Sequence, residues 1–175
     1  MVKILSDLTL ESATDDLTVG GTITGAGKTV NLVHGVTLHR TTNLSINTST
    51  DTSATAISWS GVVDESSIYN YWSSGSTITL PVTGWYSITC HVLFSTGTGY
   101  AGRLYCVVDG TVEAQTEVQA AANTNADTMS ISTIVRAGAG STIVFRASAS
   151  ASSKVINGST RSRCSIIYLG WDGNV

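Results

Sequence analysis

The sequence predicts an all-β protein in which antiparallel strands form a two-layer sandwich. Short apolar runs, many of them alternating with polar residues, recur at roughly 8–12-residue spacing, which is typical of sandwiches. Gly, Asn, Asp and Ser divide these runs and provide the backbone conformations that turns require. A strong hairpin signal, Asp109-Gly110, separates two of the runs. Together these features favour strands from about residue 56 to the end.

The clearest strand pair spans residues 76–94. Its first strand ends at Pro81, which lacks a backbone N–H, and Gly84 allows a turn before a second strand that begins at Trp85. Side chains alternate across a strand, so the second strand has one apolar face and one mixed face. The apolar face comprises Tyr86, Ile88, Cys90, Val92 and Phe94, and the mixed face comprises Trp85, Ser87, Thr89, His91 and Leu93.

Further strands lie on both sides of this pair. Asp109-Gly110 predicts a type I′ turn, because both central positions of that turn have positive φ. This turn joins strands at 102–108 and 111–118. The remaining predicted strands are 56–59, 68–72, 129–135, 143–147 and 163–170.

Residues 1–50 show a different pattern, with apolar-polar alternations only three or four residues long. Strands this short cannot bury enough surface to offset the entropy of ordering, so the region needs neighbours. One interpretation is a β-rich anchor or stalk formed by several chains, and the other is a hairpin lid on the sandwich. The side chains expected to fix an anchor are Ile4, Leu8, Leu10, Leu17, Val19 and Ile23.

A change in composition marks the predicted domain boundary. Residues 41–55 are mostly Thr, Ser and Asn, which predicts a linker or an exposed connection. We therefore place the anchor at 1–50, its linker up to about residue 55, and the sandwich at 56–175.

The residues around the Pro81 turn resemble the signature of C1q-like and tumour-necrosis-factor-like (TNF-like) jelly rolls. Residues 107–112 are similar to the central hairpin of that fold, and residues 163–170 to its closing strand. The resemblance covers roughly residues 56–171 and implies a C1q/TNF-like jelly-roll β-sandwich that assembles as a trimer around an aromatic-lined axis. The turn at 136–140 lacks the family's Leu-x-x-Gly-Asp pattern, and no acidic cluster there suggests the calcium sites of some relatives. The matching signature positions are Ile78, Leu80, Pro81, Gly84, Tyr86 and Ile88.

Apolar residues on both faces of some strands also favour self-association. A sandwich in water leaves one face of each sheet exposed, so a second apolar face needs a neighbouring chain. A homotrimer would provide that neighbour. The side chains expected at its interface are Trp85, His91, Tyr105, Ile166 and Tyr168.

The segment from Leu17 to Gly25 is similar to segments of bacteriophage tail-fibre shafts. This resemblance implies a virion-surface protein whose N-terminal strands wind together in a three-chain stalk. It supports the anchor interpretation of residues 1–50.

Composition limits the classes of partner. At 175 residues and 18.2 kDa, the chain is long enough for one core and an appendage. Charged residues make up 12%, about half the usual fraction, so part of the surface is expected to be covered by partner chains. The net charge is −3, and no Lys/Arg cluster provides the positive surface that nucleic acid requires.

The cysteines and the N-terminus indicate where the protein is made. Cys90, Cys106 and Cys164 lie in apolar runs and have no disulfide or zinc spacing, which favours buried, reduced thiols. No signal peptide and no membrane span are recognised. We expect synthesis in the host bacterial cytoplasm and a final location on the virion surface, either the capsid exterior or the tail.

No catalytic, cofactor or metal site is predicted. His34 and His39 are expected on opposite faces of a strand, and His91 is expected to be structural or at an interface. The segment 25–29 lacks the full spacing of a phosphate-binding loop and a following helix. These residues are therefore interpreted as structural.

Two surface features remain open. An aromatic and acidic patch has the composition of a glycan or partner site, although solvated loop carboxylates are the commoner interpretation. Arg103, Arg146, Arg161 and Arg163 are expected either to form pairs between subunits or to meet an acidic capsid surface. The patch comprises Asp64, Glu65, Tyr69, Tyr71 and Trp72.

The sequence thus predicts a non-enzymatic phage virion protein that forms a homotrimer. The preferred role is a capsid decoration (cement) protein or short head fibre, bound through its N-terminal part to the major capsid protein or other virion proteins. The alternative role is a tail-fibre or receptor-binding protein that recognises a host-surface glycan. A secreted C1q-domain lectin is less favoured because it would require a signal sequence.

Overall fold

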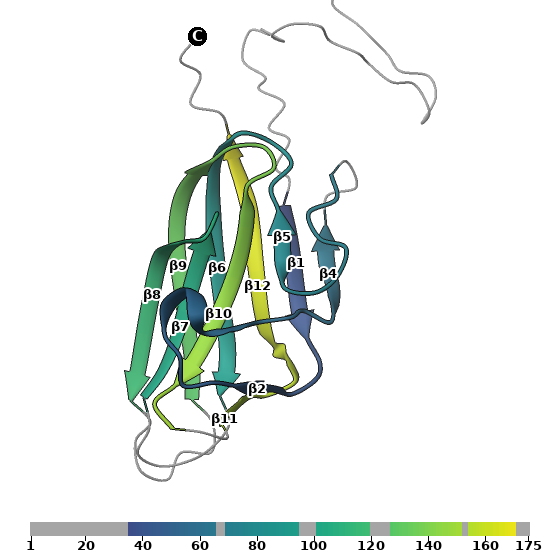
Figure 1. The fold of residues 1–175 in the computed structure, drawn as a ribbon. Helices are drawn as coiled ribbons and strands as arrows, with labels where there is room; N and C mark the ends of the chain where they lie inside the picture. Colours follow the sequence, from purple (N-terminus) through teal and green to yellow (C-terminus); the bar gives the residue numbers. More distant parts are fainter. Residues whose placement is uncertain (1–34, 66–68, 95–100, 120–126, 152–153, 171–175) are drawn as a thin grey trace, which may run out of the picture. The chain divides into compact units, whose positions relative to one another are not determined.

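Two antiparallel β-sheets pack face to face in the computed structural model of the protein (Figure 1). The structure describes residues 35–65, 69–94, 101–119, 127–151 and 154–170. Within these ranges nearly all regular structure is β-strand, with one short 3-10 helix, η1 (Asp51–Ser53). The predicted all-β sandwich is therefore confirmed.

The first sheet, sheet A, is centred on the long strand β6. β6 pairs with β9 on one side and with β12 on the other, and β12 pairs in turn with β1 and β1 with β4. Next to the start of β12, the short strand β11 pairs with the end of β6 and with β2. The bounds are β1 (Gly35–Arg40), β2 (Leu44–Ile46), β4 (Gly61–Glu65), β6 (Gly84–Phe94), β9 (Asp127–Ala137), β11 (Lys154–Ile156) and β12 (Ser159–Gly170).

The second sheet, sheet B, has β7 and β10 at its centre. β8 pairs with one side of β7, and two short strands, β3 and β5, pair one after the other with the far side of β10. The bounds are β3 (Thr55–Ala56), β5 (Thr77–Thr79), β7 (Ala101–Val108), β8 (Thr111–Gln119) and β10 (Thr142–Ala149).

The order of pairing is that of a jelly roll. The first and last strands in sequence, β1 and β12, pair with each other. Moving inward along the chain, β3 and β5 pair with β10, β6 pairs with β9, and β7 pairs with β8. The predicted central hairpin is therefore β7–β8, and the predicted closing strand lies within β12. Both predictions are confirmed.

Local chemistry explains the central hairpin. Asp109 has φ 47° and Gly110 has φ 81°, the two positive values that a type I′ turn requires. The Asp109 carboxylate accepts a hydrogen bond of 2.7 Å from the Thr142 backbone N–H, and this bond lowers the pKa of Asp109. The turn is thereby tied to the start of β10.

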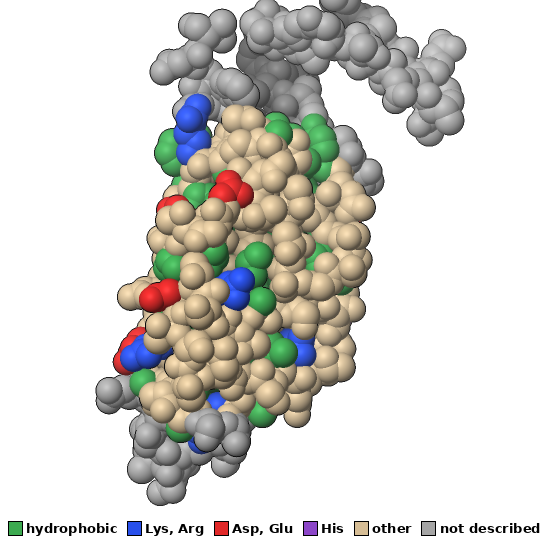
Figure 2. Space-filling model, in the orientation of Figure 1, with side chains coloured by type: hydrophobic (Ala, Val, Ile, Leu, Met, Phe, Trp, Pro, Cys, Tyr) green, Lys and Arg blue, Asp and Glu red, His purple; other side chains and the backbone are tan. Residues whose placement is uncertain are grey.

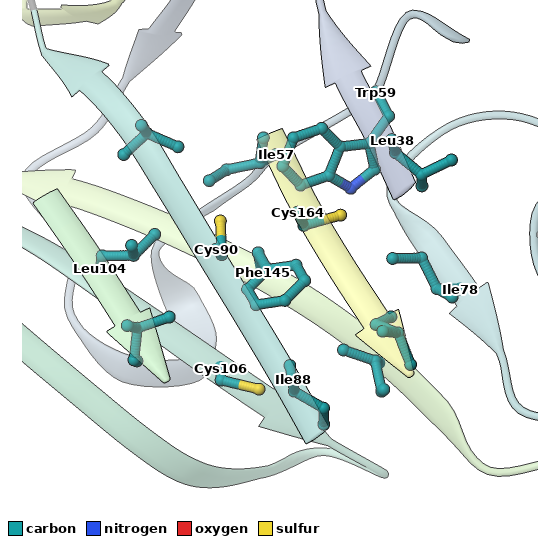
Figure 3. Close-up of a cluster of buried hydrophobic side chains, with 14 of the residues drawn as sticks. Leu38, Ile57, Trp59, Ile78, Ile88, Cys90, Leu104, Cys106, Phe145 and Cys164 are labelled. Carbon is teal, nitrogen blue, oxygen red and sulfur yellow. The ribbon is translucent and has the colours of Figure 1, made fainter. Parts of the chain in front are cut away.

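The core lies between the two sheets. The inward face of β6 is fully buried, as its alternation predicts, and it meets apolar side chains from β7 and β10 (Figure 3). Trp59 and Phe145 contact each other edge to face, with ring centroids 6.0 Å apart and planes at 87°. Labelled core residues in Figure 3 include Leu38, Ile57, Ile78, Ile88, Leu104 and Cys164.

The sandwich begins earlier than the sequence analysis placed it. The prediction assigned residues 1–50 to the anchor, yet β1 and β2 belong to sheet A, and Val33–Val175 form one compact unit. The reason is long-range pairing, since β1 and β2 pair with β12 and β11 near the end of the chain. The predicted anchor residues, at positions 4–23, lie outside the described residues.

The predicted strand at 68–72 also differs from the structure. The described part, residues 69–72, is not a strand, and the neighbouring strand is β4 instead. Tyr71 is 1% exposed and packs into the core from this irregular segment. Aromatic residues favoured a strand in the sequence, but here they pack on the core from a loop.

We predict that Phe145→Ala lowers the free energy of unfolding by about 3–5 kcal/mol, because a fully buried ring is lost and a cavity remains. Urea unfolding at one fixed protein concentration measures this change. The control Val62→Ala alters a side chain that is 39% exposed on β4, and its effect should stay within about 0.5 kcal/mol. Equal effects of the two substitutions would contradict the core assignment.

Candidate functional site

Large apolar side chains are exposed on the outer face of sheet A. Ile134, Leu169, Ile167 and Trp85 are 61%, 53%, 40% and 38% exposed, and they come from β9, β12 and β6. Ile134 and Ile167 both pair in register with Ser87 of β6, from opposite sides, so the three strands bring them close together. We call these four residues the apolar end of sheet A.

The other end of the same face is basic. Arg163 of β12 pairs with His91 of β6. Two residues further along β6, Leu93 pairs with Thr128 of β9. These four residues and Arg161 line a hollow of about 420 Å³, which we call the basic pocket. Small hydroxyl side chains lie between the two ends, where the Thr37 hydroxyl donates a 3.2 Å hydrogen bond to the Ser165 hydroxyl.

The structure separates the five predicted interface residues. Trp85 and His91 lie on the outer face of sheet A, as the alternation of β6 predicts. Ile166, which is 0% exposed, and Tyr168 lie on the core side of β12. There the centroids of the Tyr168 and Tyr86 rings are 5.3 Å apart. Tyr105, 1% exposed, lies in sheet B in a small buried cluster with residues including Ala54. These residues therefore do not form one surface.

The residues that complete the exposed face were missed. Residues 166–169 of β12 are apolar at every position, so the sequence does not reveal that Ile167 and Leu169, rather than their neighbours, face outward. Ile134 did carry a signal. Ile131, Thr133 and Val135 share one face of β9, and Ile134 lies on the other face. The alternation therefore indicates an apolar side chain on the outer face of the sheet.

The predicted glycan patch is mostly packed against the protein's own core. Tyr71 is buried, which raises the pKa of its hydroxyl, and its backbone N–H donates a 2.8 Å hydrogen bond to the Glu65 carboxylate. The Trp72 indole N–H donates to the Gly75 carbonyl at 3.1 Å, and Tyr69 and Trp72 are half-buried against the core. Asp64 is exposed on β4. Tyr71 therefore has no ring face open for a sugar to stack on.

The four arginines that sequence analysis grouped lie on both sheets. Arg161 and Arg163 are in the basic pocket of sheet A. In sheet B, Arg103 forms a 2.6 Å ion pair with Glu117, and Arg146 donates a 2.7 Å hydrogen bond to the Ala54 carbonyl. A polar hollow of about 350 Å³ adjoins this ion pair, and its lining includes Asp51, Tyr105 and Gln115.

The surface is sparsely charged, and no metal-binding arrangement is found in the described ranges. The face in Figure 2 is mainly uncharged, with only a few basic and acidic side chains. Among the described residues, no group of three or more His, Cys, Asp or Glu side chains is placed to hold a metal ion. In the same part of the chain, no helix has the length and apolar character that spanning a membrane would need.

The three thiols are free and buried, as predicted. Cys90 and Cys164 are direct cross-strand partners, and Cys106 lies in sheet B on the other side of the core (Figure 3). Burial raises the pKa of all three thiols, that of Cys106 to about 12. Because the thiolate is the reactive form, these thiols are poor nucleophiles in the folded protein.

Comparison with solved structures identifies the fold. No family model matches the chain, and no curated protein matches it. A crystal structure of murine APRIL at pH 5.0 matches with a TM-score of 0.60 and 12% identity, covering 78% of this chain and 99% of that one. The structure of Eiger TNF from S. frugiperda matches with a TM-score of 0.58 and 10% identity, covering 81% and 96%. The fold is therefore a TNF-like jelly roll, as the sequence resemblance implied.

We predict that the native protein resists a thiol reagent such as DTNB at pH 8 and that all three thiols react in urea. Their raised pKa keeps protons bound in the folded state, so this contribution to stability is complete below about pH 9 and declines as the pH rises. The free energy of unfolding should fall by up to about 1.4 kcal/mol per thiol for each pH unit above 9. Rapid labelling of the native protein would contradict the burial.

Proposed function

We propose that the protein is a non-enzymatic structural component of a bacteriophage virion and acts as a homotrimer. The observation that carries the trimer is the apolar end of sheet A. Four large apolar side chains exposed on one face, in a chain with few charges, are typical of a surface that a partner covers. A second copy of the chain is the partner proposed.

A threefold axis beside the outer face of sheet A would bury the apolar end in every subunit. Ile134, Ile167 and Leu169 would then meet the same residues of neighbouring subunits near the axis. Removing their exposed area from water contributes about 25 cal/mol for each Å², which amounts to several kcal/mol per subunit. The C1q/TNF resemblance implies the same trimeric mode of assembly.

The proposed virion role rests on the N-terminal segment. Its similarity to tail-fibre shafts supports a three-chain anchor that binds the major capsid protein or another virion protein, while the jelly roll projects from the particle. Buried free thiols agree with synthesis in a reducing bacterial cytoplasm. Decoration or a short head fibre is the preferred role, because the aromatic patch does not present the buried Tyr71 ring to a glycan.

A receptor-binding tail fibre is the second candidate. It is favoured by the partial exposure of Trp72 and the exposure of Asp64 on β4, which leave some aromatic and acidic surface for a host glycan. This candidate shares the trimer and the anchor with the first one. The two differ in where the protein is found on the particle.

We predict that the purified protein is a trimer by light scattering and that Ile134→Glu with Ile167→Glu converts it to monomers, because three negative charges per position would meet near the axis. Thr111→Glu adds one negative charge at an exposed position of β8 in sheet B and should leave the trimer intact. A wild-type monomer at micromolar concentration would refute the trimer. A double variant that remains trimeric would refute this face as the interface.

We predict that labelled protein added to virions depleted of it binds across the head at dozens to hundreds of copies. Electron microscopy and quantitative mass spectrometry locate and count the copies. Removal of residues 1–34, which precede β1, should abolish binding while light scattering still detects the trimer. A few trimers at the tail would favour the receptor-binding role instead, and normal docking of the truncated protein would refute the anchor.

A further inference from the structure

The polar hollow lies on the outer face of sheet B, on the side of the sandwich opposite the proposed trimer interface. One side of the hollow comes from β7 and β8, and the other comes from the segment that contains η1, which crosses this face (Figure 1). Its volume of about 350 Å³ is within the range of about 300–1,000 Å³ for small-molecule sites. The lining includes Thr50, Asp51, Arg103, Tyr105, Gln115 and Glu117.

Strand pairing fixes one side of the hollow. Tyr105 pairs in register with Gln115, and Arg103 pairs with Glu117, to which it also forms the 2.6 Å ion pair. These four side chains therefore share one face of two adjacent strands. Tyr105 is 1% exposed, so its hydroxyl lies beside the Arg103 guanidinium while its ring presents no open face.

Hydrogen bonds hold the segment around η1 in place on this face. The Arg146 guanidinium donates a 2.7 Å bond to the Ala54 carbonyl, and the Asn47 side-chain amide donates a 3.0 Å bond to the Ser53 carbonyl. Asp51 has φ 53°, a left-handed conformation that Asp and Asn adopt more readily than most residues. The Asp51 carboxylate is therefore presented to the hollow by a backbone that is already ordered.

The hydrogen-bonding groups of the hollow suit a neutral ligand with several hydroxyls. A sugar hydroxyl can donate to a carboxylate while it accepts from an amide or guanidinium N–H. The charge of Arg103 is offset by Glu117, which leaves the Asp51 carboxylate to repel an anion. Within the described ranges, neither the Asp51 carboxylate nor the Gln115 amide has a hydrogen-bond partner in the protein, so both are available to ligand hydroxyls.

The hollow stays accessible in the proposed trimer. If the outer faces of sheet A meet at the axis, the outer faces of sheet B point away from it, and three hollows face the surroundings. One hollow is expected to bind a sugar weakly, because the sugar exchanges its hydrogen bonds with water for similar bonds with the protein. Three linked sites that bind one sugar-covered surface raise the effective affinity without any new contact.

We propose that the polar hollow binds a neutral sugar unit of a glycan, through Asp51, Gln115 and the Arg103–Glu117 pair. The hollow is formed within one subunit, so binding of a free sugar does not depend on the proposed function. Only the gain from simultaneous binding at three hollows rests on the proposed trimer. The hollow is separate from the aromatic and acidic patch, whose Asp64 is on β4 of sheet A.

Titration of the full chain with glucose, galactose and mannose, followed by saturation-transfer NMR, tests the site. We expect saturable, millimolar binding of at least one of these sugars, which Asp51→Asn weakens by about tenfold because a charge-assisted hydrogen bond is lost. Asn tolerates the positive φ at this position, so the backbone should be retained. The matched control is Glu113→Gln, which removes one negative charge from an exposed position of β8 outside the lining and should bind as wild type does.

Absence of binding by all three sugars would overturn the proposal, as would equal affinity of Asp51→Asn and Glu113→Gln. Gln115→Ala provides a second variant on the opposite side of the hollow, should Asp51→Asn fail to fold, and circular dichroism verifies the fold of each protein. Gln115→Ala should also weaken binding, because the side-chain amide is lost.

Glucuronate, galacturonate and mannuronate test the preference for a neutral ligand. Each differs from its parent sugar at one carbon, where a carboxylate replaces a hydroxymethyl group. We expect every acid to bind more weakly than its parent, because the Asp51 carboxylate repels it. Tighter binding of an acid than of its parent sugar would overturn the assignment of a neutral ligand.

Dissociation from a sensor surface that carries the bound sugar tests the contribution of the trimer. The variant with Ile134→Glu and Ile167→Glu, altered on the opposite face, should bind the free sugar as wild type does but leave the surface at least about tenfold faster. Equal dissociation of the two proteins would refute the gain from three hollows and leave the site intact. A wild-type monomer that binds the sugar would support the site and refute the proposed trimer.

Discussion

The pairing of β6 with both β9 and β12 is the interaction on which the rest of the structure depends. It fixes which side chains of β6 enter the core, and β12 then places β1 and β4 at the edge of the same sheet. The start of β6 allows no side chain. Gly84 has φ +156°, and a Cβ atom there would come within 2.5 Å of the Tyr168 ring and 2.6 Å of the Gly170 carbonyl oxygen.

Features set by neighbouring residues were predictable from the sequence, and features set by distant pairing were not. The alternation of β6 and the Asp109-Gly110 turn are encoded within a few residues, so their faces and conformations could be assigned. β1 carries only a short alternation, and its place in the sandwich depends on β12, where Thr37 bonds to Ser165, 128 residues away. The predicted domain boundary therefore fell within the sandwich.

The surface residues of the candidate site also depend on pairing between distant strands, so the sequence predicted them only in part. Tyr71 beside Glu65 has the composition of a sugar site, but the free energy gained by burying an aromatic ring favours packing it into the core. Ile166 and Ile167 are identical neighbours on opposite faces of β12. The register of β12 with β6 decides which of them faces the core. Residue type therefore identified candidate surfaces, while strand register decided which side chains share them.

The two ends of the outer face of sheet A differ in what they would contribute to an assembly of this chain. Contact at the apolar end favours association under all ionic conditions, because it depends on area removed from water. The other end, around Arg163 and His91, carries mainly polar and basic side chains and offers little apolar area to a neighbour. Both ends are carried by the same paired strands, so in the proposed trimer neither could move away from the axis alone. In the proposed trimer, the net stability of association therefore depends mainly on the apolar end.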